Sequence, residues 1–333
     1  MRIGMNPQKQ SKKIDLKYQH RLIIVVFIPN LEGYYQNVFE VFKLCLESAI
    51  TTVNDKCAIT IVNNASCEET TNYLNESFKK GKIDTLIHHK ENIGKMDALI
   101  GAAKGSREPL ITLSDVDILF KYGWQNEIEN IFASMKNVGS VSPIPVRKSM
   151  RYGTTSTLQK VFTGKVKLTF ESIKANFDDH NKYLKSINWE IENEENLKWP
   201  IISQNGVKAI LGSGHQIMTL NRLIFHNTVP IEPSLTLVGN NSEFLYCDEP
   251  VDISGGMRLA TYNNFAFHMG NKVENWMIEI QEENIKKREN NKFKSVDISK
   301  LIFKPKRQSK KQFLLKQRII IKFFNLFYSH KIN

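Results

Sequence analysis

The chain has 333 residues, 41% of them hydrophobic, and a formal net charge of +12 at pH 7. That length allows one large or two modest domains with a buried core. The charge gathers at the ends: residues 1–21 carry six Lys/Arg against one Asp, and residues 304–333 carry nine against no acid. Because the middle is nearly neutral, the sequence excludes a nucleic-acid-binding core, which needs a basic face on the folded domain itself.

Cysteine use and the absence of long apolar runs predict a cytoplasmic protein. The four cysteines form no CxxC pair and are too sparse for a disulfide scaffold, so a reducing compartment is expected. The basic N-terminus has no apolar core, and no signal peptide is predicted. No run of 18 uncharged apolar residues exists, so no membrane-spanning helix is predicted either.

The first third of the chain alternates strand and helix patterns. The apolar, β-branched run 22–29, "LIIVVFIP", predicts a strand buried on both faces. Further strands are predicted at 58–64, 85–89 and 109–115. Helices are predicted at 34–50, at 68–80 and within 92–105, the last beginning after Gly94 and ending at Gly105. This alternation predicts βαβ units and a parallel sheet with helices on both faces.

The remainder of the chain has weaker patterns. Residues 138–146 predict another strand followed by a loop. Residues 151–200 have no clear period, and we expect a mobile insert over the site. The segment 211–225 begins with small residues and continues with an apolar stretch, and the segment 243–271 ends in the strand-like "FAFHM".

Each predicted strand ends in polar residues. The clusters are Pro29-Asn30, Asn63-Asn64, Glu91-Asn92 and the pair Asp115 and Asp117. Ligands of open parallel sheets bind beyond the carboxyl ends of the strands, so the clusters are expected to meet in one site. A single polar strand end, by contrast, indicates only an ordinary turn.

The pair Asp115 and Asp117 is a candidate metal site. Alternate residues of an extended chain point to opposite sides, so the two carboxylates can share a metal only if the strand ends between them. Mg²⁺ and Mn²⁺ prefer oxygen ligands and are often held by one or two carboxylates together with substrate phosphates. Taken alone, an Asp-x-Asp pattern is typical of an acidic turn.

Several motifs that follow one another along the chain favour a functional role for Asp115 and Asp117. They are "VNNAS" (62–66), "ENIGKMDALIGAAKG" (91–105), "SDVD" (114–117), "GSGHQIM" (212–218) and "YCDEPVD" (246–252). Across residues 22–270 the chain resembles the inverting GT-A glycosyltransferases of family 2, of the type that builds bacterial polysaccharides and other glycans. The resemblance implies an α/β fold with a Rossmann-like, mostly parallel twisted sheet flanked by helices. It also implies a nucleotide-diphosphate sugar donor, Mn²⁺ or Mg²⁺, and transfer to a hydroxyl with inversion.

The resemblance also implies roles for single residues on the donor side. The implied donor contacts are Pro29, Asn30, Asn64, Asn92, Gly94, Lys95 and Asp115. Asn64 stands where the family often has a base-contacting Asp, so the identity of the base stays open. Asp117 would ligate the metal with help from His268, which could equally be a histidine of a strand in the core.

The acceptor side is implied by two further motifs. One carboxylate must deprotonate the acceptor hydroxyl, and the family usually supplies it from a Glu-Asp pair. This chain has Asp248-Glu249 in the reverse order, with Asp252 nearby, and either residue could be the base; a solvated acidic loop is the alternative. The other implied acceptor-side residues are Gly212, Gly214 and His215, and a purely structural role is open for the histidine.

Residues 276–333 form a basic, helical tail. On a helical wheel of 304–328, Lys311, Arg318, Lys322 and Asn325 share a narrow polar stripe, and apolar residues fill most of the rest. This pattern is typical of a helix lying in a membrane interface, here the inner face of the cell membrane. Packing against the domain or a second chain is the alternative.

The predicted organisation is a basic N-terminal segment (1–21), a glycosyltransferase domain (22–275, with a nucleotide-binding half at 22–120 and an acceptor half at 138–275) and the tail. The predicted partners are a sugar nucleotide and a glycan or lipid-linked acceptor. A membrane-tethered sugar-nucleotide- or glycan-binding subunit with a degenerate site is one alternative. A nucleotidyltransferase is a weaker one, because "NLEGYYQ" (30–36) is a poor match to the loop it needs.

Overall fold

The structure is a computed structural model that describes residues 4–10, 13–293, 296–299, 301–306 and 308–328. Its α-helices are α1 (Val38–Thr52), α2 (Glu68–Lys79), α3 (Lys95–Gly105), α4 (Trp124–Ser134), α5 (Thr155–Phe162), α6 (Ala175–Ser186), α7 (Leu223–Asn227), α8 (Glu249–Ile253), α9 (Asn275–Asn290) and α10 (Lys310–Tyr328). Its strands are β1 (His20–Val26), β2 (Cys57–Asn64), β3 (Thr85–His89), β4 (Leu110–Ser114), β5 (Ile118–Phe120), β6 (Val138–Ser142), β7 (Lys167–Ser172), β8 (Lys198–Gln204), β9 (Val207–Leu211), β10 (Ile217–Asn221), β11 (Met257–Ala260) and β12 (Ala266–His268). Shorter helical turns occupy Pro7–Gln10, Gly33–Tyr35, Arg147–Arg151 and Phe244–Asp248.

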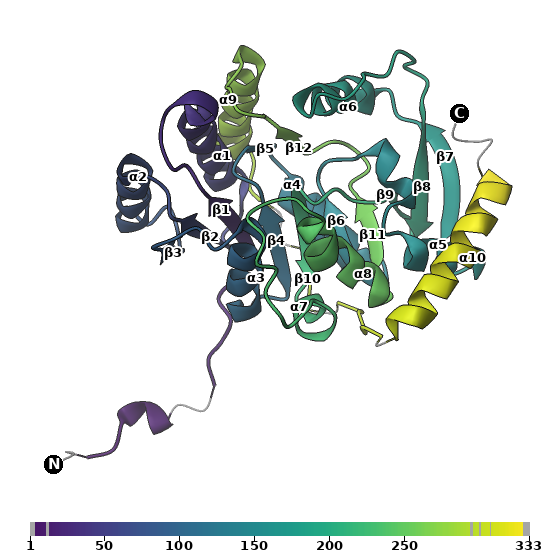
Figure 1. Ribbon diagram of the computed structural model, residues 1–333, viewed down its shortest axis with the longest axis horizontal. Helices are drawn as coiled ribbons and strands as arrows, with labels where there is room; N and C mark the ends of the chain where they lie inside the picture. Colours follow the sequence, from purple (N-terminus) through teal and green to yellow (C-terminus); the bar gives the residue numbers. More distant parts are fainter. Residues whose placement is uncertain (1–3, 11–12, 294–295, 300, 307, 329–333) are drawn as a thin grey trace.

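The centre of the molecule is a ten-stranded sheet with the order β3-β2-β1-β4-β10-β6-β11-β9-β8-β7 (Figure 1). Strands β1 to β4 are parallel, and β10 runs antiparallel between β4 and β6. Seven strands, β1 to β4, β6, β8 and β11, run in one direction. The mostly parallel sheet flanked by helices therefore confirms the predicted fold class.

Strand β1 shows why helices cover both faces. Side chains alternate between the two faces of a strand, and Leu22, Ile24 and Val26 belong to the buried cluster that includes α1. Ile23 and Val25 belong to the cluster on the other face, with α3 and α7. Every one of these five residues is buried, which accounts for the continuous apolar run in the sequence.

The prediction of a mobile insert at 151–200 is wrong. This segment forms α5, β7, α6 and β8, and β7 and β8 extend the main sheet as an antiparallel edge. Its strands are partly exposed: β7 has no buried residue, and β8 is buried only in its middle. A half-covered edge strand of this kind leaves little hydrophobic periodicity to read in the sequence.

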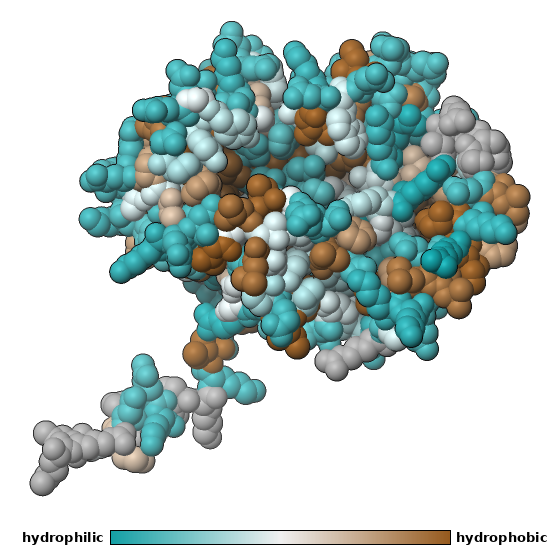
Figure 2. Space-filling model, viewed as in Figure 1, coloured by the Kyte–Doolittle hydropathy of each residue, from teal (hydrophilic) through white to brown (hydrophobic). Residues whose placement is uncertain are grey.

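The C-terminal helix α10 lies along α5 and β7 at the end of the sheet (Figure 1). Phe313 and Phe324 are buried, and the ring of Tyr328 packs at a tilt against Phe162 and Phe170. Other apolar residues of α10 are exposed: Leu314, Leu315, Ile319, Phe323, Leu326 and Phe327. Figure 2 shows them on the right of the molecule, interleaved with basic side chains. Across the described residues, none of the helices combines the length and apolar character needed to cross a membrane.

Candidate functional site

A cavity of about 500 Å³ opens at the carboxyl ends of β1, β2 and β4. Its lining combines polar strand ends with aromatic and aliphatic side chains: Val25, Phe27, Tyr34, Tyr35, Val38, Asn64, Asn92, Lys95, Asp115, Val116, Asp117, Leu237, Val238, Gly270 and Asn271. Five of the residues predicted for the donor and metal sites are in this lining. We call it the donor cavity.

Asn64 and Asn92 fix the loop that leads into α3. The Asn64 side chain donates to Asn92 Oδ1 at 2.8 Å and accepts from the Ile93 amide at 3.1 Å. Asn92 Oδ1 also accepts from the Gly94 amide at 2.9 Å. Gly94 has φ +92°, and a Cβ there would lie 2.2 Å from the Thr236 carbonyl oxygen. Only glycine fits this position, because it alone has neither the φ restriction nor the clashing atom.

Lys95 places a cation in the donor cavity. Its ammonium lies 2.7 Å from Asp115 Oδ1 and 3.7 Å from Glu243 Oε1. Burial lowers the pKa of Lys95, but the charges of Asp115 and Glu243 outweigh it, so the pKa is raised overall. Burial raises the pKa of Asp115, helped by Asp117 and opposed by Lys95. The first turn of α3 thus holds a firmly protonated lysine next to the acidic pair.

Asp117 and His268 meet through the small sheet of β5 and β12. Antiparallel pairing sets His268 opposite Ile118, and His268 Nε2 lies 3.2 Å from Asp117 Oδ2. Ser186 Oγ contacts the other ring nitrogen at 2.9 Å. Burial lowers the pKa of His268, but the hydrogen bond and charge of Asp117, with the charge of Asp115, raise it overall.

The same pair fits a hard divalent metal ion. Asp117 Oδ1 is buried and has no hydrogen-bond partner among the described residues, which leaves a carboxylate oxygen free for another ligand. An imidazole and a carboxylate suit Mn²⁺, and Mg²⁺ also takes a carboxylate. No group of three or more His, Cys, Asp or Glu ligands occurs in the part of the chain that the structure describes. A metal ion held by this pair would need further oxygen ligands, such as phosphate oxygens or water.

Asp248 is fully buried, away from the lining of the donor cavity. Its Oδ1 accepts from Arg258 at 2.5 Å, and its Oδ2 lies 3.0 Å from His215 Nδ1. Arg258 has no exposed surface, whereas the His215 side chain is 31% exposed. Gln216, the next residue, accepts from the Asp115 amide at 2.8 Å, so His215 lies beside the end of β4.

Other predicted site residues have different surroundings. Glu249 pairs with Lys310 at the start of α10 and does not line the donor cavity. Asp252, predicted on the acceptor side, instead accepts from the first two amides of α5 at 2.9 and 2.6 Å, so it acts as a helix cap. Pro29 and Asn30 lie in the loop after β1 and outside the lining, and the Asn30 side chain accepts from the amide of Glu32.

Gly212 and Gly214 belong to a tight turn. Gly212 has φ +98°, and a Cβ there would meet the Ser149 carbonyl oxygen at 2.6 Å. A Cβ on Gly214 would lie 2.5 Å from the Gln216 side chain. In both cases the absent side chain makes room for this protein's own atoms. The two glycines thereby shape the turn that carries His215.

Sequence reasoning missed several residues of the site. Glu243 approaches Lys95 from a segment with no strand or helix period, and its pKa is lowered because Lys95 and backbone amides outweigh burial. Leu237 and Val238 come from the loop 228–242, whose Leu237 carbonyl accepts from the Lys95 amide. Tyr34 and Tyr35 supply aromatic faces. The two tyrosines after the first strand could have been identified in the sequence as candidate site residues, because nucleotide bases stack on such rings.

The comparisons with known proteins come from sequence and from structure. Residues 34–191 match the model of glycosyl transferase family 2. The matched residues include the end of the Asn64 strand, the α3 loop and both Asp115 and Asp117. A search of curated proteins finds no match to the chain.

Several solved structures have a similar fold. GalNAc-T7, solved with UDP, GalNAc and Mn²⁺, is similar over 95% of this chain and 57% of its own, with a TM-score of 0.50 and 12% identity. S. aureus TarS (residues 1–349) is similar over 93% of this chain and 72% of its own, with a TM-score of 0.46 and 8% identity. The mannosyltransferase PcManGT from Pyrobaculum calidifontis, solved with GDP-Man and Mn²⁺, is similar over 96% of this chain and 80% of its own, with a TM-score of 0.44 and 13% identity.

Proposed function

We propose that the chain is a glycosyltransferase, because residues 34–191 match the model of glycosyl transferase family 2. The protein transfers a sugar from a nucleotide-diphosphate donor to a hydroxyl of a glycan or lipid-linked acceptor, with inversion at the anomeric carbon. One observation carries this proposal: the unpartnered Asp117 Oδ1 lies in a cavity that also contains Lys95 and two asparagines at strand ends. Those groups suit a metal-bound diphosphate next to a nucleotide.

On the donor side, Asp117 and His268 would hold Mn²⁺ or Mg²⁺. When bound, the metal would supply positive charge to the diphosphate as it leaves. Lys95 adds a second cation from the first turn of α3, where the helix dipole also favours anions. Tyr34 and Tyr35 offer aromatic faces to the base, and Asn64 and Asn92 offer amides to the nucleoside. Asp115, tied to Lys95, is available to a hydroxyl of the ribose or the transferred sugar.

On the acceptor side, we assign the proton transfer to the pair His215 and Asp248. The sequence favoured Asp248 or Glu249 as a free carboxylate base, but Asp248 is fully buried in an ion pair with Arg258 and Glu249 pairs with Lys310. Asp248 instead holds one ring nitrogen of His215, and the partly exposed imidazole can accept the hydroxyl proton through the other. A buried carboxylate that orients a histidine is an arrangement found in other base-catalysed enzymes.

The experiment is nucleotide release by the purified protein with a panel of UDP and GDP sugars, each with Mn²⁺, Mg²⁺ or EDTA. Asp117→Asn should abolish metal-dependent donor binding, measured by calorimetry, while the fold measured by circular dichroism is retained. Unchanged metal-dependent binding in this variant would refute the metal assignment. Donor binding without turnover, in the presence of plausible acceptors, would favour a binding subunit with a degenerate site.

The base assignment has its own test. His215→Gln should lower kcat by about 10²–10⁴-fold with little change in donor affinity. Glu249→Gln is the matched control, because its side chain pairs with Lys310 outside the cavity, and its kcat should stay within about twofold of wild type. A large loss in Glu249→Gln together with normal turnover in His215→Gln would return the role of base to the carboxylate.

We further propose that α10 contacts the cytoplasmic face of the cell membrane. The supporting observation is its exposed apolar surface beside basic residues; Leu315 is 62% and Leu326 is 71% exposed. In flotation with anionic vesicles, Leu315→Ser/Leu326→Ser should reduce binding. Ile231→Ser, a loop residue that is 92% exposed, is the control. Equal flotation of wild type and the double variant would refute membrane contact through α10.

A further inference from the structure

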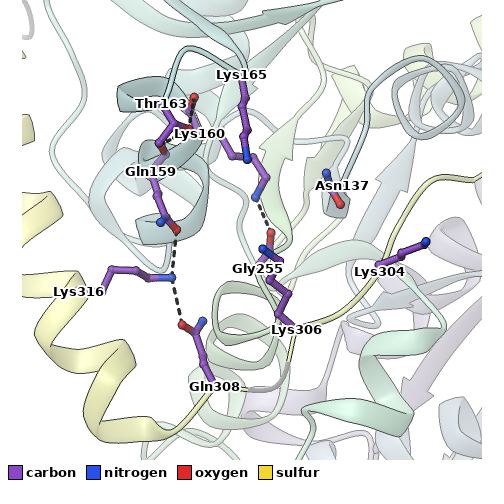
Figure 3. Close-up of a pocket in the computed structure, with 10 residues that line it drawn as sticks. All are labelled: Asn137, Gln159, Lys160, Thr163, Lys165, Gly255, Lys304, Lys306, Gln308 and Lys316. Atoms are coloured by element: carbon purple, nitrogen blue, oxygen red, sulfur yellow. Dashed lines mark hydrogen bonds between the residues drawn. The ribbon is translucent and has the colours of Figure 1, made fainter.

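A second cavity, of about 260 Å³, lies between α5 and the segment that precedes and begins α10 (Figure 3). We call it the lysine cavity. It is lined by Asn137, Gln159, Lys160, Thr163, Lys165, Gly255, Lys304, Lys306, Gln308 and Lys316. Nothing in the proposed reaction uses these residues.

The lysine cavity and the donor cavity lie at opposite edges of the sheet. Asn137 immediately precedes β6, and Gly255 lies two residues before β11. Both strands run in the direction of β4, because β10 is antiparallel to β4 and to β6, and β11 is parallel to β6. The lysine cavity is therefore at the amino ends of two strands that run parallel to the strands with the donor cavity at their carboxyl ends. It cannot hold the diphosphate of the same donor molecule.

The lining has five cations and no carboxylate. The side chains of Lys165, Lys304 and Lys306 make no hydrogen bond or ion pair with any residue that the structure describes. The acids closest in sequence are already engaged: Asp252 caps α5, and Glu249 pairs with Lys310. Five ammonium groups around one cavity repel one another unless an anion lies between them.

Two of the lysines are held in fixed directions. Lys160 Nζ donates to the Gly255 carbonyl oxygen at 2.5 Å and to the Ser156 carbonyl oxygen at 3.3 Å. Figure 3 shows Lys316 reaching from α10 between Gln159 and Gln308, and it donates to both side-chain oxygens at 3.3 Å. An ammonium has three donors, so each of these two lysines keeps one N–H for a ligand.

The state of Lys160 fits an anion site. Burial lowers its pKa to about 8; Asp252 opposes this shift, and the nearby cations Lys316, Lys306 and Lys165 add to it. A lysine whose charge is this unfavourable gains more from a bound anion than a solvated lysine does. Three of the five cations come from the C-terminal segment, and the other two come from α5 and the turn after it. A ligand that binds all five would join the C-terminal segment to α5.

We propose that the lysine cavity binds a phosphate-bearing anion: inorganic phosphate, diphosphate or a phosphomonoester headgroup. A phosphate group offers several acceptor oxygens and close to two charges, which matches convergent lysine donors better than a single carboxylate does. The enclosed volume suits a compact anion and not a strand of nucleic acid, which needs an open basic groove. The bound anion joins residues 304–316 to α5 and so fixes the base of α10.

The test is calorimetry of the full-length protein with sodium diphosphate and with inorganic phosphate, in EDTA. Lys306→Gln/Lys316→Gln should weaken diphosphate binding by at least about tenfold, since two charge-assisted contacts are lost. Lys79→Gln/Lys82→Gln, which removes two exposed lysines of the distant α2 region, is the charge-matched control and should bind as wild type does. Circular dichroism and thermal unfolding without ligand check that both variants fold.

A further variant separates this site from the donor cavity. Lys95→Gln should leave diphosphate binding in EDTA unchanged, because Lys95 is the cation of the donor cavity. Loss of binding in Lys95→Gln with retention in Lys306→Gln/Lys316→Gln would put the anion in the donor cavity and overturn the proposal. Absence of binding to wild type, or equal affinity in all variants, would overturn it as well. Because the readout is binding without metal or sugar donor, the result does not depend on the proposed reaction.

Vesicles distinguish the two sources of the anion. If the ligand is a lipid headgroup, vesicles that contain phosphatidic acid should compete with diphosphate, and phosphatidylserine vesicles of equal charge should compete less. If the ligand is a free anion, neither vesicle should compete. Equal competition by both vesicle types, with no binding of free diphosphate, would indicate a nonspecific basic surface and would refute a phosphate site.

Discussion

The buried pair Asp248 and Arg258 gives the sharpest prediction about stability. Both side chains have no exposed surface, and Arg258 also donates to the carbonyl oxygens of Tyr152 and Ser213 at 2.7 and 2.8 Å. Asp248→Asn keeps the size of the side chain but leaves the arginine buried without a counterion. Removing one partner of such a pair costs about 3–5 kcal/mol. With an unfolding entropy of ~2.1 cal/mol/K per residue, this lowers Tm by about 4–7 °C.

The assay is guanidinium unfolding followed by circular dichroism, with thermal unfolding as a second measurement. Asp248→Leu/Arg258→Met should be more stable than Asp248→Asn, because a buried apolar pair has no unpaired charge. His215→Gln removes only a partly exposed contact of the same carboxylate and should cost about 1 kcal/mol or less. Two results would contradict this role of the ion pair. One is a free energy of unfolding for Asp248→Asn within about 1 kcal/mol of the wild-type value. The other is a loss of stability in the double variant equal to the sum of the losses in the two single variants.

Three further predictions concern the loop of α3, the cap of α5 and the lysine cavity. Gly94→Ala should lower the free energy of unfolding by about 1–3 kcal/mol and weaken donor binding, because the new Cβ would lie 2.2 Å from the Thr236 carbonyl oxygen. Gly101→Ala is the control: it has open space around it, so its free energy of unfolding should be unchanged or higher. Asp252→Ala should lower the free energy of unfolding by about 2–3 kcal/mol, since two buried amides lose their acceptor; a loss below about 0.5 kcal/mol would contradict its role as a cap. Burial lowers the pKa of Lys160 from 10.5 to about 8 in the folded protein. Between these two pH values the unfolded state binds more protons than the folded state does. The free energy of unfolding should therefore rise with pH across this window, by at most about 3 kcal/mol. Lys160→Met should remove this rise, and identical pH profiles of unfolding would refute the shift.

The strands and helices of residues 20–114 could be predicted because each of them has a clear period. Residues 22–26 of the apolar run are buried on both faces in β1, which ends at Val26, and α3 begins and ends at the residues expected from Gly94 and Gly105. The strands β5 and β12 have three residues each, which is too short for a period to show. They pair across about 150 residues of sequence, and only the folded chain brings them together.

The donor side of the site followed from the sequence better than the acceptor side did. Strand ends are local features, and parallel strands bring their carboxyl ends to one edge, so Asn64, Asp115 and Asp117 could be placed together in advance. Asp248 and Asp252 lie in a short helical segment whose buried partners are Arg258 and the start of α5. Their surroundings depend on contacts between elements far apart in sequence, and nothing in "YCDEPVD" distinguishes a buried carboxylate or a helix cap from a base in a pocket.

One short segment contacts both His215 and the lysine cavity. Asp248 holds His215 beside the end of β4, Asp252 caps α5, and the Gly255 carbonyl accepts from Lys160 in the lysine cavity. A bound anion that draws Lys160 away from Gly255 would act on the segment that orients His215. Reciprocity then requires that donor or acceptor binding change the affinity for the anion by the same factor. Coupling of this kind should depend on the cap that joins the segment to α5, so a variant at Asp252 should reduce it more than a variant at Glu249, which faces away from both cavities toward α10.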